Sequence, residues 1–174
     1  GGEKILDETI FGVQVEVEFK PIYTSQPLFA DVDRFIHDKL ELELFDIRKA
    51  YWKYKEGREI GPSKGQLIFG DALYFRDPFK MLKWCERFGN KEANNKIIMA
   101  CFMGILYGYH DYCLCLLGQP LILQWIKAET VERLKAIVIE NARCIKYSYR
   151  GMGKISTLLR LFSKVFEGDH EGWA

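Results

Sequence analysis

The chain has 174 residues, of which 48% are hydrophobic and 28% are charged, and its formal net charge is +1. This balance is typical of a globular protein and excludes a disordered one. It also leaves no overall field that would attract nucleic acid or an acidic membrane surface. The length predicts one domain, or one domain with an appendage.

The cysteines favour a reducing compartment. There are five, an odd number, and the chain is long enough to fold without disulfides. Cys113 and Cys115 lie close together in sequence, but no second pair or histidine cluster stands at zinc spacing. We therefore expect buried, reduced thiols in a cytoplasmic protein that has no metal site.

The first predicted element is a strand at Val13–Phe19. Its apolar residues alternate with Gln14, Glu16 and Glu18, and a period of two is the pattern of a strand. Pro21 ends the run. Two carboxylates thus stand beside the valines, close to the point where the strand ends.

Two further strands follow a short helix. The apolar spacing over Leu28–Ile36 predicts an amphipathic helix, and the next strand is expected at Leu42–Ile47. The charged and aromatic run Arg48–Gly65 ends in Gly and Pro residues and is interpreted as a loop. The third strand is expected at Gln66–Phe75, where Gly70 predicts a bulge or a close backbone approach.

Helices fill the rest of the chain, beginning with Asp77 as a cap and Pro78 in the first turn. His110 and Asp111 interrupt the apolar tract Ile97–Gly118, so we expect two helices in a soluble core and no membrane span. These two residues are expected to cap a helix, with metal binding as the alternative. The predicted helices are Phe79–Phe88, Lys91–Tyr107, Tyr112–Leu117, Leu121–Tyr147 and Lys154–Phe166.

The order of the elements suggests part of a larger sheet. A strand–helix–strand crossover predicts that the first two strands are parallel, and the loop before the third strand allows an antiparallel pair. Parallel sheets need both faces covered, and one helix cannot do this. The three strands therefore resemble the back half of an α/β domain.

Three blocks of sequence resemble the C-terminal half of the FkbM family of S-adenosylmethionine-dependent methyltransferases. They are VQVEVEF, QPLFADVDRF and GDALYFRD, in this order and at family-like separations. The resemblance implies the C-terminal half of a Rossmann-like class I methyltransferase sheet, followed by an α-helical tail. Val13–Phe19 would be its fifth strand, Leu42–Ile47 the sixth and Gln66–Phe75 the antiparallel seventh, inserted beside the fifth. Residues 1–78 would form the partial methyltransferase domain and residues 79–174 the helical extension.

The resemblance also implies an activity, the transfer of a methyl group from S-adenosylmethionine to a hydroxyl of a small molecule or glycan. The family binds this cofactor through a glycine-rich turn, and no D-x-G-x-N-x-G stretch occurs in these residues. We therefore expect that the cofactor-binding half is missing from this chain. The fragment alone would be inactive, and the cofactor would bind only to the intact protein.

The predicted acceptor site lies at the end of the first strand, because open α/β sheets bind ligands beyond the carboxyl ends of their strands. Glu18 and Glu16 are the catalytic candidates, since a carboxylate can orient a hydroxyl or accept its proton. Glu16 could instead pair with Arg48 or Arg76, and such a pairing would hold it ionised and inert as a base.

Three more residues are candidates for substrate binding. Tyr23 and Gln26 lie in the loop after the first strand, where substrate contacts are common, although both could simply pack and cap the following helix. Asp71 could face the pocket, or it could satisfy the backbone at a bulge.

A different class of function is also open. The chain could be a non-catalytic α/β interaction module that pairs through an exposed sheet edge and through its helical tail. The apolar positions of Leu121–Tyr147 suit packing either on the sheet domain or on a second subunit, so a homo-oligomer is possible.

Overall fold

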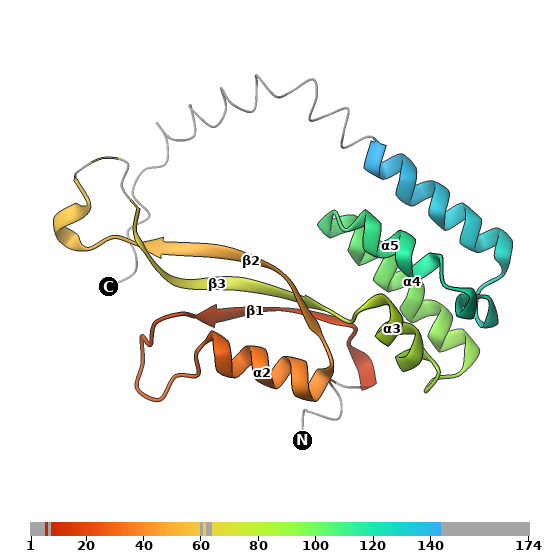
Figure 1. Ribbon diagram of the computed structural model, residues 1–174, viewed down its shortest axis with the longest axis horizontal. Helices are drawn as coiled ribbons and strands as arrows, with labels where there is room; N and C mark the ends of the chain where they lie inside the picture. The colour runs from red at the N-terminus through yellow and green to blue at the C-terminus, as the bar shows by residue number, and fades with distance from the viewer. Residues whose placement is uncertain (1–5, 7, 60, 62–63, 144–174) are drawn as a thin grey trace. The chain divides into compact units, whose positions relative to one another are not determined.

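The computed structural model describes residues 6, 8–59, 61 and 64–143. Two compact units divide the chain, Gly1–Ala100 and Cys101–Ala174. The predicted helix Lys154–Phe166 lies outside the described residues. The elements, shown in Figure 1, are β1 (Gly12–Glu18), α2 (Phe29–Leu40), β2 (Glu43–Trp52), the 3-10 turn η1 (Lys55–Gly57), β3 (Gln66–Phe75), α3 (Pro78–Cys85), α4 (Asn90–Tyr107), α5 (His110–Leu117) and the 3-10 turn η2 (Pro120–Gln124).

The fold is α/β, with a three-stranded sheet in the order β1-β3-β2. β3 is antiparallel to both of its neighbours. β1 and β2 therefore run in the same direction, as the crossover predicts, but they are not adjacent because β3 lies between them (Figure 1).

One face of this sheet packs on α2. The amphipathic helix and the alternating strands place their apolar sides together, and each fully buried aliphatic side chain there contributes about 1.5–3 kcal/mol. α2 begins where the Asp31 carboxylate accepts a hydrogen bond from Leu28 N at 3.0 Å, and it extends to Leu40. The buried residues of this core are Val17, Ile36, Leu40, Leu42, Ala72 and Tyr74.

β2 is longer than predicted. It runs to Trp52, although its second half carries the charged and aromatic side chains that suggested a loop. Pairing with β3 holds this half in place, up to Trp52 opposite Gln66. β2 pairs only with β3 among the described strands, and such an edge position tolerates exposed polar side chains.

Gly70 is a point of close backbone approach, one of the two predicted possibilities. A Cβ placed on it would lie 2.8 Å from the carbonyl oxygen of Arg48 in β2. The register irregularities lie elsewhere. One leaves Phe45 of β2 as an extra residue between Leu44 and Asp46, and the other leaves Ile68 of β3 as an extra residue opposite the step from Ala50 to Tyr51.

The start of α3 matches its prediction. The Asp77 carboxylate accepts hydrogen bonds from Phe79 N at 2.9 Å and from Lys80 N at 3.4 Å, and Pro78 occupies the first turn. Trp84 of this helix is buried between two cations, with Arg76 Cζ at 4.8 Å and Lys96 Nζ at 4.5 Å from its ring centroid. Such contacts stabilise by about 0.5–2 kcal/mol each.

The apolar tract Ile97–Gly118 forms two helices, as predicted. α4 ends at Tyr107, Gly108 takes a positive φ of 85°, and α5 begins at His110. The Cys113 thiol donates a hydrogen bond to the Cys101 carbonyl at 3.2 Å and packs against Gly104. Within the described ranges, no helix has the length and apolar character needed to cross a membrane.

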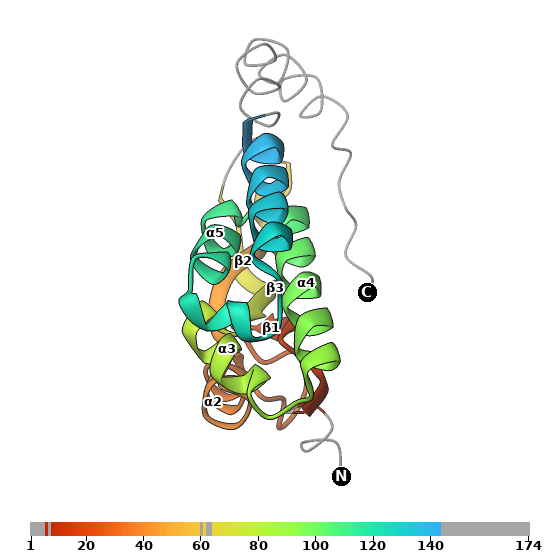
Figure 2. The same cartoon turned by 90° about the vertical axis from the view of Figure 1, so that its right-hand side faces the viewer.

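Two helical predictions in this part of the chain are wrong. Leu121–Tyr147 is not one helix, because it opens with η2 and is α-helical only from residue 128 (Figure 2). The described part of that helix is residues 128–143, and residues 144–147 of the prediction lie outside the described residues. His110 and Asp111 do not cap α5. Its N-cap residue is Tyr109, and the His110 ring contacts Asn141 Oδ1 at 2.9 Å.

Candidate functional site

The carboxyl ends of β1 and β2 meet at one edge of the sheet, because both strands are antiparallel to β3. The first residues of β3 lie at the same edge, with Glu18 opposite Phe69 and Trp52 opposite Gln66. We call this the carboxyl edge. In open α/β sheets it is the edge at which ligands bind.

A polar cluster forms at the carboxyl edge around Gln66. Its side-chain Oε1 accepts hydrogen bonds from Tyr54 OH at 3.0 Å and from Lys20 Nζ at 3.5 Å. Lys can only donate, so the accepting atom is the amide oxygen. Lys20 Nζ also lies 6.0 Å from the Tyr54 ring centroid. We call Lys20, Tyr54 and Gln66 the Gln66 cluster; the sequence analysis had not singled out any of the three.

The loop between β1 and α2 is braced by Gln26. Its Oε1 accepts hydrogen bonds from Ile22 N at 2.9 Å and from Tyr23 N at 3.1 Å, while Ser25 holds a positive φ of 62°. The side-chain oxygen of Gln26 is thus occupied by the loop itself. This arrangement makes Gln26 a positioning residue, while Tyr23, 72% exposed, is the largest of the side chains that the loop presents to solvent.

The three predicted carboxylates share one face of the sheet. Glu16 stands opposite Asp71, which in turn stands opposite Arg48, and Glu18 lies two residues beyond Glu16. Side chains alternate along a strand, so these residues lie on the face away from Val17 and α2. Glu18 ends β1 at the carboxyl edge, whereas Glu16 and Asp71 lie further back along the strands.

The predicted ion pairs of Glu16 are not present among the described residues. Arg48 is in register with Asp71 and makes no ion pair within 4.0 Å, and Arg76 pairs with Glu41 instead. Glu16 is exposed and Glu18 is half-buried. Both carboxylates are therefore open to a ligand.

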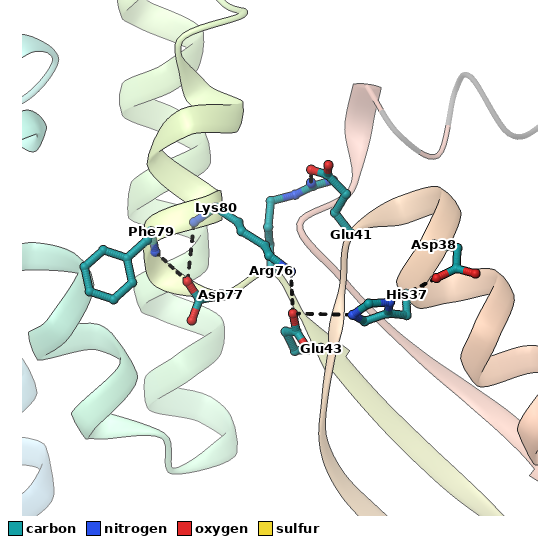
Figure 3. A network of polar contacts seen from close by, with 8 residues as sticks. All are labelled: His37, Asp38, Glu41, Glu43, Arg76, Asp77, Phe79 and Lys80. Atoms are coloured by element: carbon teal, nitrogen blue, oxygen red, sulfur yellow. Dashed lines mark hydrogen bonds and ion pairs between the residues drawn. The ribbon is translucent and has the colours of Figure 1, made fainter.

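The opposite edge of the sheet holds a network that the sequence analysis had not identified (Figure 3). Arg76 follows β3 and is fully buried, with Nη1 at 3.2 Å from Glu41 Oε2. Lys80 donates to the Glu43 carboxylate, and this hydrogen bond raises the pKa of Lys80. His37 Nε2 lies 3.9 Å from Glu43. The only signal in the sequence was an arginine set directly before the Asp77–Pro78 helix start.

A hollow of about 530 Å³ lies beside this network. Its lining mixes cations and anions, and two of them already face a partner of opposite charge, Lys80 with Glu43 and Glu41 with Arg76. Three cations stand against two anions, an excess of a single charge, so the hollow offers little to a charged ligand and we regard it as structural. It is lined by Glu41, Lys80, Lys83, Trp84, Glu86 and Arg87.

The remaining reactive groups offer little chemistry. In the part of the chain that the structure describes, no group of three or more His, Cys, Asp or Glu residues is placed to hold a metal ion. Cys85, Cys101 and Cys113 are buried free thiols, and burial raises the pKa of Cys85 to about 11. A thiol in this state is a poor nucleophile near neutral pH.

Comparisons with protein-family models, with curated proteins and with solved structures found no match. A functional assignment therefore starts from the carboxyl edge and from the order and direction of the strands. The order is β1-β3-β2, with the middle strand reversed.

Proposed function

We propose that this chain is the acceptor-side part of an FkbM-like, S-adenosylmethionine-dependent O-methyltransferase. The observation that carries the proposal is the order of the strands. In the sheet that the resemblance implies, the last strand is antiparallel and is inserted beside the fifth. β3 is the last strand of this sheet, is antiparallel, and pairs with β1, which corresponds to the fifth.

The side of β1 that faces away from β3 also supports the proposal. Arg76 N donates to Phe11 O and Phe19 N donates to Ile68 O, both at 2.7 Å, so the odd-numbered residues of β1 bond to β3. The alternation of an antiparallel ladder then turns the backbone N–H and C=O groups of Glu16 and Glu18 to the other edge. An edge of this kind is a template for another strand. A strand of the cofactor-binding half would pair there.

The residues of the carboxyl edge suit the acceptor side of this reaction. S-adenosylmethionine, bound by the intact protein, supplies an activated methyl group, so most of the rate comes from positioning the acceptor. Glu18 can orient the acceptor hydroxyl and take its proton. The loop braced by Gln26 and the Gln66 cluster would hold the rest of the acceptor molecule.

The test compares this chain with the product of the complete reading frame. We expect that the sequence encoded upstream of Gly1 contains a strand followed by D-x-G-x-N-x-G, and that only the longer protein binds S-adenosylmethionine in calorimetry. Micromolar binding by the 174-residue chain would refute the idea of a missing cofactor half. An upstream sequence without such a motif would remove the methyltransferase assignment.

Substitution of Glu18 tests its role in the longer protein. Glu18→Gln is expected to lower kcat by about 10²–10⁴ while leaving cofactor affinity unchanged, because a general base acts on the chemical step. Glu140→Gln, an exposed change on the helix at residues 128–143, is the matched control. Equal rates for the two variants would exclude Glu18 as the base.

The alternative is a non-catalytic module in which the open edge of β1 pairs with another polypeptide. The same two backbone positions, Glu16 and Glu18, support it. If this alternative holds, the 174-residue chain should sediment as a defined oligomer in sedimentation velocity. It should also unfold in one cooperative transition. A monomer that lacks cooperative unfolding would contradict it.

A further inference from the structure

The hairpin between β2 and β3 concentrates positive charge and aromatic rings. We call residues 48–65 the arm; residues 60, 62 and 63 of it lie outside the described part of the chain. The arm holds six Lys or Arg residues against two Glu, although the whole chain has a net charge of only +1. Three of its rings are well exposed: Tyr51 at 54%, Trp52 at 45% and Tyr54 at 68%.

The arm joins the carboxyl edge. Tyr54 donates to Gln66 Oε1 at 3.0 Å, and Lys20, from the segment after β1, reaches the same oxygen at 3.5 Å. Lys53 Nζ donates to Gly61 O at 2.9 Å, which ties the two sides of the arm together. In Figure 1 the arm forms the distal end of the β2–β3 hairpin, around η1. Tyr54 and Lys20 therefore lie at the carboxyl edge, next to the predicted acceptor site. Tyr51 and Trp52 are neighbours in β2, so only one of these two rings can face the same side of the sheet as Glu18.

The cations of this region are not neutralised by acids. Among the described residues, Lys20, Lys55 and Arg58 take part in no ion pair. This contrasts with the other edge of the sheet, where Arg76 pairs with Glu41 and Lys80 with Glu43. A surplus of positive charge among exposed rings suits a ligand that brings its own anions.

We propose that the arm and the Gln66 cluster bind an acidic glycan and hold it at the carboxyl edge as the methyl acceptor. This inference rests on the proposed function, because it names the acceptor of that site. The C–H face of a sugar ring packs on an exposed Tyr or Trp ring, and its carboxylate or sulfate groups pair with Lys and Arg. The Gln66 oxygen is already shared by Tyr54 and Lys20, so the groups left to hydrogen-bond sugar hydroxyls are the Gln66 amide N–H groups and the lone pairs of the Tyr54 hydroxyl.

A glycan fits this surface better than the other polyanions do. Nucleic-acid binding draws on about six to ten phosphate contacts, whereas the arm has six Lys or Arg against two Glu, a net charge of +4. A membrane surface would call for a face of apolar side chains that insert among the lipids. Two of the three exposed rings are tyrosines, and the charged residue Lys53 stands between Trp52 and Tyr54.

The test measures binding of the 174-residue chain to polygalacturonate, a polymer of uronic acid, with neutral dextran as the uncharged control. The double variant Lys55→Gln/Arg58→Gln removes two charges from the arm. The matched control, Lys91→Gln/Lys127→Gln, removes two charges from exposed positions elsewhere. We expect the arm variant to bind about tenfold more weakly and the control variant to bind like the parent chain. Equal binding by the two variants would overturn the proposal.

Two further measurements define the ligand class. Tyr54→Ala is expected to weaken binding to polygalacturonate more than Tyr54→Phe, which keeps the ring and loses only the hydroxyl. Thermal melting of each variant verifies that it is folded. A single-stranded oligonucleotide of deoxythymidine and phosphatidylserine vesicles are expected to bind at least about tenfold more weakly than the uronate polymer. Equal or tighter binding of either one would reject an acidic glycan as the ligand.

The test of glycan binding can fail or succeed independently of the test of the proposed methyltransferase function. Binding of polygalacturonate by the chain, with no methyl transfer by the longer protein, would keep the arm as a glycan site and reject the enzyme. Methyl transfer to a neutral small alcohol, with no binding of the polymer, would keep the enzyme and reject the acidic glycan.

Discussion

The Arg76 guanidinium has no exposed surface, and its Nη1 lies 3.2 Å from the carboxylate of Glu41. Its Cζ also lies 4.8 Å from the centroid of the Trp84 ring. A buried cation is costly unless its surroundings compensate the charge, so these contacts tie the end of α2 to the junction between β3 and α3.

Substitution of Arg76 should reveal how much this junction contributes to stability. We expect Arg76→Ala to lower the free energy of unfolding by about 3–5 kcal/mol, because it leaves a cavity and removes the cation–π contact. Arg76→Met keeps much of the side-chain volume, so it should lower the free energy of unfolding by less than Arg76→Ala does. Urea unfolding measures both, and an alanine variant as stable as the parent would contradict this account.

Glu41 should behave differently, because 67% of its side chain is exposed and its φ is 55°, in the left-handed region. Solvent screens the pair, so Glu41→Gln is expected to cost only about 1 kcal/mol. Glu41→Gly removes the same carboxylate but relieves the backbone, which favours it by about 0.5–1 kcal/mol over Gln. If the glycine variant is the less stable of the two, the backbone argument fails.

Tyr74 should make stability fall at high pH. Burial and a hydrogen bond of 3.1 Å to Asp33 raise the pKa of Tyr74 well above its usual value of about 10. In the unfolded chain the phenol ionises near pH 10, but in the folded chain it stays neutral. Its contribution is therefore complete below pH 10 and is lost as the pH rises above it.

The measurement is the free energy of unfolding between pH 8 and pH 11 for the parent and for Tyr74→Phe. At pH 8 the free energy of unfolding of the variant should be about 1 kcal/mol lower than that of the parent, because the hydrogen bond to Asp33 is missing. Above pH 10 the stability of the variant should fall less steeply than that of the parent. Parallel pH profiles for the two proteins would show that Tyr74 is not the responsible group.

Gly104 and Cys113 should be energetically coupled. A Cβ added at Gly104 would lie 2.5 Å from Cys113 Sγ, so Gly104→Ala forces α4 and α5 apart. We expect a loss of about 1–3 kcal/mol, even though alanine favours a helix over glycine. In the double variant Gly104→Ala/Cys113→Ala the sulfur is gone, and part of the loss should return. A double-mutant cycle with zero coupling would contradict the contact.

Gln26 should control the order of the loop that carries Tyr23. Gln26→Ala removes both hydrogen bonds to the backbone of Ile22 and Tyr23, which contribute about 0.5–1.5 kcal/mol each. The loop is exposed, so the loss should be local. Hydrogen exchange at Ile22 and Tyr23 should quicken by about tenfold or more while amides in β3 keep their protection. Unchanged exchange at Ile22 would show that Gln26 does not brace the loop.

Local patterns in the sequence predicted most of the elements, because short-range physics determines them. The alternation of β1, the full extent of β3 and the Asp77–Pro78 helix start could all be identified from neighbouring residues. The second half of β2 could not, since its charged and aromatic side chains resemble a loop and only pairing with β3 holds it extended. Tertiary pairing overrode local preference there.

The site residues divide in the same way. Strand period alone places Glu16 and Glu18 on one face of β1, but placing Asp71 on the same face needs the register of β1 against β3. Lys20, Tyr54 and Gln66 come from three separate segments. Their meeting depends on the register of β1 and β2 against β3. No local pattern reports that register, so the cluster became visible only in the folded chain.

The position of β3 has a consequence for how the sheet assembles during synthesis. Among the described strands, β1 and β2 hydrogen-bond only to β3, which is the last of the three to leave the ribosome. Until Gln66–Phe75 emerges, β1 and β2 have no strand to hydrogen-bond to among the described strands, and α2 is the element against which they can pack. Over this interval β1 and β2 are open to chaperones and proteases, and arrival of β3 pairs one side of each in a single step.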